Sequence, residues 1–138
     1  MSNLPSRHRP TLTDLILKHQ ITTSAHHSAV HDPTFFGSTC WMVEMRRPGT
    51  AFTYTKPFYM GPGLGARPPE TAEFLEAQLR EASTVHDNPS FATWCGDLGY
   101  ATDDRRAKSI HQKVLVNYGD LTQFLDDLFE TFLYAEPE

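Results

Sequence analysis

The residues best suited to chemistry are seven histidines and two cysteines, which could hold zinc or form a cysteine-histidine nucleophile. His26, His27 and His31 precede Cys40 in the sequence. Structural zinc sites have paired ligands two to five residues apart at both ends of the site, and Cys40 has no such neighbour. We therefore interpret this stretch as a solvent-exposed loop that carries histidines, and we expect no metal or other cofactor.

The second cysteine, Cys95, has the neighbours that a thiolate nucleophile would need. His86 and His111 lie in adjacent predicted elements and could act as a base. However, Cys95 falls on the apolar side of a predicted helix beside Trp94, and burial makes a thiol inert. We therefore expect a structural cysteine, no disulfide framework and no enzymatic activity.

A glycine-rich segment and two pairs of adjacent acids could serve phosphate or metal chemistry. The segment 61–65 lacks the Lys-Ser/Thr of a P-loop, and Pro62 removes a phosphate-binding amide, which favours a sharp connection between elements. Adjacent helical residues project about 100° apart, so neither acid pair converges on one ion. These pairs are Asp103 with Asp104 and Asp126 with Asp127.

Charge is divided along the chain. Residues 1–69 carry seven Lys or Arg against three Asp or Glu, a formal charge of +4. Residues 70–138 carry five against fourteen, a formal charge of −9. A potential of one sign over half of a small protein attracts a surface of the opposite sign. The division therefore points to a binding partner and not to a reaction.

Two sets of residues are candidates for partner binding. The basic set surrounds a predicted hairpin and consists of Arg46, Arg47 and Lys56; its modest charge argues against direct nucleic-acid binding. The acidic set lies on the last predicted helices and the tail, where carboxylates could replace phosphates on a basic surface, with one aromatic anchor. Its members are Asp103, Asp104, Asp120, Asp126, Asp127, Glu130, Glu136 and the anchor Tyr134.

The elements that would position these residues predict an α+β fold. Residues 1–10 are predicted to form a flexible arm, and 11–138 a single domain. Thr11 as N-cap with Asp14 in the first turn predicts a short helix ending near Gln20. Residues 21–39 show no period and are predicted to form a long loop. Alternation over 41–46, a turn at 47–50 and strand residues at 52–55 predict a β-hairpin, which 58–60 extend.

The second half is predicted to contain four helices. The first follows Pro69, and the second runs from residue 88 to Gly99, which suits a helix C-terminus. Thr102 is the predicted N-cap of the third, and Gly119-Asp120 should separate it from the fourth. The predicted inward-facing residues are Ala72, Leu75, Leu79, Ala82, Phe91, Trp94, Cys95, Leu98, Ala107, Ile110, Val114, Tyr118, Leu121, Phe124, Leu125, Leu128, Phe132 and Leu133.

The second half contains the motif Phe91-x-x-Trp94-Cys95-x-x-x-Gly99-Tyr100-x-Thr102-Asp103-x-Arg105-x-Ala107, whose specific core is Trp-Cys and Gly-Tyr-x-x-Asp. In this motif the chain resembles a family of small uncharacterised proteins encoded by bacteriophages and prophages, over about residues 11 to 130. This chain differs at Asp104, where Ser is common, and in its longer acidic tail. The resemblance implies a phage or mobile-element setting.

The charge pattern and the resemblance together suggest an anti-CRISPR-like protein. We expect it to bind and inhibit a host defence nucleoprotein complex, such as a CRISPR surveillance complex, with an acidic surface that competes with nucleic acid. The alternative is a phage accessory protein that binds nucleic acid directly in regulation or replication. The sequence has no apolar segment long enough to span a membrane, so we expect the protein in the host bacterial cytoplasm.

Overall fold

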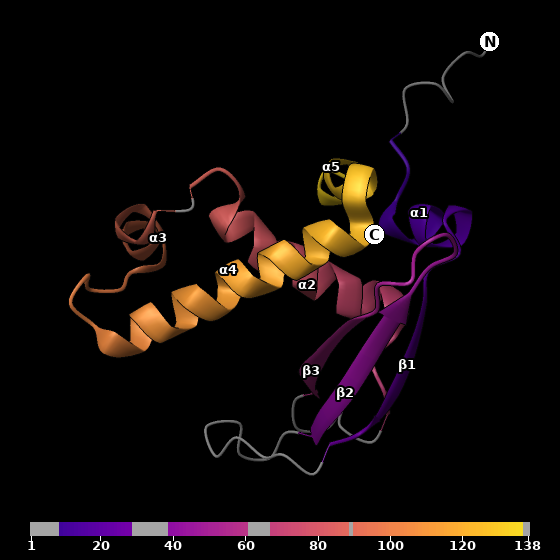
Figure 1. Cartoon of the computed structure of the whole chain (residues 1–138), viewed down its shortest axis with the longest axis horizontal. Helices are drawn as coiled ribbons and strands as arrows, with labels where there is room; N and C mark the ends of the chain where they lie inside the picture. The colour runs from indigo at the N-terminus through magenta and orange to yellow at the C-terminus, as the bar shows by residue number, and fades with distance from the viewer. Residues whose placement is uncertain (1–8, 29–38, 61–66, 89, 137–138) are drawn as a thin grey trace. The chain divides into compact units, whose positions relative to one another are not determined.

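A computed structural model describes residues 9–28, 39–60, 67–88 and 90–136 and confirms the α+β class (Figure 1). By its contacts the chain divides into two compact units: unit 1, Met1–Leu75 with Ala135–Glu138, and unit 2, Glu76–Tyr134. His31 and the segment 61–65 lie outside the described residues. The elements, in order, are α1 (Leu12–Lys18), β1 (Thr22–His27), β2 (Thr39–Arg46), β3 (Tyr54–Met60), α2 (Thr71–His86), α3 (Phe91–Leu98), α4 (Arg105–Leu125), η3 (Asp126–Leu128) and α5 (Phe129–Leu133).

Unit 1 contains an antiparallel sheet of strand order β1-β2-β3. The prediction of a loop over 21–39 is wrong for its first part, because Thr22–His27 form β1 and pair with Arg46–Trp41 of β2. Residues 29–38 lie outside the described residues. β1 was not predicted because an edge strand buries little apolar surface. Its residues are half-buried or exposed, and none of them is a large apolar residue. It therefore lacks the apolar alternation that reveals a strand.

The predicted hairpin is confirmed, with a longer connection than expected. β2 pairs with β3 from Thr39 opposite Met60 to Met45 opposite Tyr54, so residues 47–53 connect the strands and the second strand begins at 54 instead of 52. Gly49 has φ +85° within this connection, a conformation that glycine adopts without steric cost. β3 continues through Pro57 to Met60, because an edge strand tolerates a residue that cannot donate to the ladder.

One face of the sheet carries the core of unit 1. Val43, Met45 and Tyr54 are completely or almost completely buried there. Phe74, from the beginning of α2, makes edge-to-face contacts with Tyr54 and Phe58, with ring centroids 6.1 and 5.7 Å apart. Such aromatic pairs stabilise a core beyond the area that they bury. The first turns of α2 are therefore fixed against the inner face of the sheet.

Helix α1 begins as predicted. The Thr11 hydroxyl accepts a hydrogen bond from the Asp14 amide at 3.1 Å, and the Asp14 carboxylate accepts one from the Thr11 amide at 3.2 Å. This capping box satisfies two main-chain donors that the helix leaves unpaired. The helix ends at Lys18, and Gln20 follows with φ +54°.

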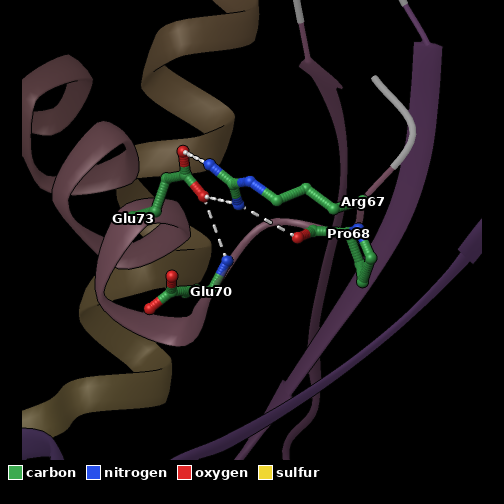
Figure 2. Close-up of polar contacts among 4 residues, drawn as sticks. All are labelled: Arg67, Pro68, Glu70 and Glu73. Atoms are coloured by element: carbon green, nitrogen blue, oxygen red, sulfur yellow. Dashed lines mark hydrogen bonds and ion pairs between the residues drawn. The ribbon is translucent and has the colours of Figure 1, made fainter. Parts of the chain in front are cut away.

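A bidentate ion pair joins the segment before α2 to its first turn (Figure 2). The Arg67 guanidinium donates to both carboxylate oxygens of Glu73 at 2.9 and 3.2 Å, and also to the Pro68 carbonyl at 3.3 Å. One of these oxygens also accepts the amide hydrogen of Glu70 at 3.1 Å. The hydrogen bond from Arg67 lowers the pKa of Glu73 against the opposing effect of burial.

We expect Glu73→Gln to remove a pH-dependent part of the stability. Since the folded-state pKa of Glu73 lies below its unfolded value of about 4.3, the pair stabilises the fold above that pH. The contribution is lost as the pH falls through the lower folded-state pKa. Thermal unfolding should give the wild type a melting temperature no more than a few degrees higher at pH 7, because the pair is partly exposed, and no higher in acid. An equal difference at every pH would contradict this.

Unit 2 corrects three predictions about helix ends and faces. The N-cap of α4 is Asp104 and not Thr102; its carboxylate accepts from the amides of Arg106 and Ala107 at 2.8 and 3.3 Å. Gly119-Asp120 does not end a helix, because α4 continues to Leu125. Leu98, predicted to face inward, is 46% exposed. The end of α3 at Gly99, in the left-handed conformation with φ +82°, is as predicted.

The corrected cap of α4 makes a direct prediction. Asp104→Ala should destabilise unit 2 by about 1 kcal/mol, because two amides at the start of a 21-residue helix lose their acceptor. Thr102→Ala removes an exposed hydroxyl outside the helix and should change the free energy of unfolding by less than about 0.5 kcal/mol. Urea unfolding of both variants measures the difference, and the reverse order of effects would restore Thr102 as the cap.

The core of unit 2 surrounds α3 and α4. One cluster of buried residues consists of Val85, Trp94, Cys95, Ala107 and Val114. The predicted inward-facing residues of this unit that are likewise buried are Leu79, Ala82, Leu121, Phe124, Leu125 and Phe132; Leu75, also predicted and buried, belongs to unit 1. In the described part of the chain, no helix combines the length and the apolar character needed to cross a membrane.

Candidate binding surface on helix α4

The first three turns of α4 carry a cationic surface that the sequence reasoning missed. Arg105, Arg106, Lys108 and Lys113 are all exposed, and residues 105–119 contain no Asp or Glu. At about 100° per residue they spread over about 160° of the helix surface, centred on the side opposite most of its buried residues. We call these four residues the basic face. A charge count over residues 70–138 hides it, because fourteen acids outnumber it.

Helix stability does not account for the basic face. The N-terminus of a helix carries a partial positive charge, so cations in the first turn are unfavourable by roughly 0.3–1 kcal/mol each. Arg105 and Arg106 are the first two residues of α4, directly after the capping Asp104. Among the described residues, no carboxylate forms an ion pair with them. These cations stand where the helix itself would prefer acids.

The other end of α4 carries exposed carboxylates that the sequence did predict. Asp126, Asp127 and Glu130 lie at the junction of α4, η3 and α5, and all three side chains are exposed. We call them the acidic corner. In the described part of the chain, no Lys, Arg or His forms an ion pair with any of them. Burial raises the pKa of the nearby Tyr118 hydroxyl, and the charges of Asp87 and Glu130 raise it further.

The backbone at Asp126 is strained. Its φ of 53° and ψ of −125° lie outside the regions that residues with a side chain ordinarily adopt. Such conformations cost of order 1–3 kcal/mol and persist where the surrounding structure imposes them. This turn bends the chain from α4 into η3 and α5, and thereby places the three carboxylates at one corner.

Replacing Asp126 by glycine should relieve this strain. Glycine adopts positive φ without steric cost, so we expect Asp126→Gly to raise the free energy of unfolding by about 1 kcal/mol. Asp126→Ala, which removes the carboxylate and keeps a β-carbon, is the matched control and should not stabilise. Equal stability of the two variants in urea unfolding would show that the backbone is relaxed.

The remaining predicted acidic residues are not gathered at this corner. Asp103 is exposed and Asp104 caps α4, about 33 Å from Asp126 at 1.5 Å per residue. Asp120 is half-buried on α4. Tyr134 lies just after α5 and is 51% exposed, as an anchor would need. Glu136 belongs to unit 1.

Glu136 is held within unit 1 by neighbours in the N-terminal segment. Its carboxylate lies 4.0 Å from the Arg9 guanidinium, and its amide donates to the Pro10 carbonyl at 3.1 Å. These contacts belong to unit 1, whereas the acidic corner belongs to unit 2.

The predicted basic set does not form one surface. The Arg46 guanidinium is 2.6 Å from the Glu44 carboxylate on the outer face of the sheet. Strand alternation puts Lys56 on the opposite face, where its ammonium lies 5.5 Å from the centre of the Tyr54 ring. Arg47 follows β2 and is half-buried. Arg46 and Lys56 thus interact with neighbours on opposite faces of the sheet.

The candidate nucleophile and zinc residues form no hydrogen-bonded pair and no metal site in the described part of the chain. The Cys95 thiol is buried, which raises its pKa, and it hydrogen-bonds neither to His86 nor to His111. His86 instead bonds to the Tyr118 hydroxyl at 2.9 Å. His26 and His27 are adjacent in β1 and therefore point to opposite faces of the sheet. The described residues contain no group of three metal-ligating side chains.

No protein-family model, no curated protein and no solved structure matches this chain.

Proposed function

We propose that this chain is a binding protein that docks on the nucleic-acid-binding surface of a host defence nucleoprotein complex, as an anti-CRISPR-like inhibitor from a phage or mobile element. The acidic corner carries the proposal. Three exposed carboxylates without ion-pair partners in the described chain stand on a strained turn between two helices. Carboxylates in such an array can occupy lysine and arginine sites that otherwise hold phosphates.

The basic face provides the second contact. A nucleoprotein complex presents phosphates beside basic protein grooves, so a ligand with both signs of charge can match it at two places. α4 carries cations on its first three turns and meets carboxylates at its end. The basic face therefore takes the role that the sequence assigned to the hairpin residues Arg46, Arg47 and Lys56.

Capture from a host cell tests this function. Tagged protein is expressed in a bacterium that carries a defence system, and co-purifying proteins and nucleic acids are identified. The proposal expects a nucleoprotein complex whose nucleic-acid binding falls as our protein is added, and whose capture weakens as salt rises. Capture of the complex with unchanged nucleic-acid binding would refute the competitive mechanism.

The basic face also favours the second candidate function, direct binding of nucleic acid in phage regulation or replication. Four exposed cations on one helix side are the footprint of phosphate contacts. This function predicts salt-sensitive binding of DNA or RNA by the purified protein, lost in Arg105→Glu with Arg106→Glu. The inhibitor proposal predicts no binding of free nucleic acid at physiological salt, because the acidic corner opposes it.

A further inference from the structure

In the described part of the chain, no strand pairs with the β1 edge of the sheet of unit 1. The Ser28 amide donates to the Cys40 carbonyl at 3.0 Å, which identifies Ser28 and Cys40 as a hydrogen-bonded antiparallel pair. Such pairs alternate along a ladder, so Thr22, Ser24 and His26 also bond to β2. The main-chain groups of Thr23, Ala25 and His27 therefore point away from the sheet. They have no hydrogen-bond partner among the residues that the structure describes.

The opposite edge is protected by proline. By the same alternation, Thr55, Pro57 and Tyr59 of β3 direct their main chains outward. Pro57, in the middle of this edge, has no amide hydrogen and cannot accept a further strand in register. Natural sheets guard their edges with proline, charge or bulges. Residues 22–28 contain neither proline nor a Lys, Arg, Asp or Glu. β1, which lies on the opposite side of β2 from β3 in Figure 1, therefore has neither the proline nor the charge that could guard its edge.

The chemistry of this edge fits β1 of a second copy. A two-fold axis at Ala25 pairs Thr23 with His27 of the other copy and makes two hydrogen bonds at each of three pairs, six in all. Small residues then face each other at the axis, and Ser24 lies opposite His26 on the other face of the sheet. No pair brings like charges together at neutral pH. The hydroxyls of Thr23 and Thr71 are hydrogen-bonded at 2.8 Å, which holds β1 against the start of α2.

We propose that two copies of this chain pair antiparallel through β1 and form a continuous six-stranded sheet. The proposal does not depend on the proposed function, because the acidic corner and the basic face belong to unit 2. The contact is small, so the dimer is reversible and should form only at high protein concentration. β3 then forms both outer edges of the combined sheet, each protected by Pro57.

Sedimentation velocity of the full chain from about 10 µM to about 1 mM tests the dimer. The mass should rise from 15.6 kDa toward twice that value. Ala25→Pro should abolish this rise without loss of β-sheet circular dichroism, because the amide of Ala25 bonds to nothing in its own sheet. Thr55→Lys, on the edge of β3, is the matched control and should dimerise like the wild type.

Two charged variants test the same dimer if the proline variant fails to fold. Ala25→Lys and Ala25→Glu each place like charges together at the two-fold axis and should be monomeric. An equimolar mixture of the two should dimerise. A wild type that stays monomeric at every concentration would overturn the proposal. So would a dimer that persists in Ala25→Lys, since it would then use another surface.

Discussion

Reversing the acidic corner with Asp126→Lys, Asp127→Lys and Glu130→Lys should weaken binding to the captured partner at least about 100-fold. Each carboxylate that contacts a basic surface contributes through charge-assisted contacts, and reversal adds repulsion to the loss of attraction. The three side chains are exposed, so the far-ultraviolet circular dichroism should not change. Titration calorimetry at about 150 mM salt measures the affinity, at an ionic strength where weak long-range attraction is screened.

Net charge alone could produce part of this effect, so the comparison needs matched variants. Asp127→Lys with Glu130→Lys changes the charge as much as Glu76→Lys with Asp97→Lys, at exposed positions of the same unit. We expect the corner pair to lose most of the affinity and the other pair to change mainly the rate of association. Equal losses from the two pairs would show that the partner recognises overall charge and not the acidic corner.

The sequence predicted part of this surface because the acids are concentrated where helices end. It could not locate the rest, since a sum over residues 70–138 treats Arg105 and Asp126 as parts of one acidic half. Helix α4 is what separates them: its length puts cations and carboxylates at opposite ends. Conversely, the hairpin cations Arg46 and Lys56 lie on paired strands, but strand alternation places them on opposite faces of the sheet.

Helix starts and ends were predictable where neighbouring residues determine them, and not where several residues could form the same cap equally well. The Thr11 N-cap of α1 and the end of α3 at Gly99 depend on local sequence and were predicted. Thr102, Asp103 and Asp104 are all good N-caps, and only the packing of Ala107 fixes which one starts α4. Gly119 costs a helix about 1 kcal/mol, which burial of Leu121 and its neighbours offsets, so the helix continues.

The side chain that should matter most for stability is Trp94, which is 1% exposed at the centre of unit 2. Its ring lies nearly parallel to that of Tyr100, with centroids 5.2 Å apart, and its indole N–H donates to the Thr84 hydroxyl at 3.2 Å. Trp94→Ala leaves a large cavity and removes the hydrogen bond to Thr84, and should lower the free energy of unfolding by about 3–5 kcal/mol. Total stabilities are commonly about 5–15 kcal/mol, so much of the helical signal should be lost at moderate urea.

The control for this prediction is Leu98→Ala in the same helix. The sequence pattern placed Leu98 and Trp94 on one inward face, whereas the structure exposes nearly half of Leu98. Because little apolar area is removed from water there, Leu98→Ala should change the free energy of unfolding by less than about 0.5 kcal/mol. Comparable destabilisation by both variants would mean that Leu98 is buried and that α3 is rotated about its axis. A loss of stability confined to Trp94→Ala would confirm the orientation of α3, in which Trp94 is buried and nearly half of Leu98 is exposed.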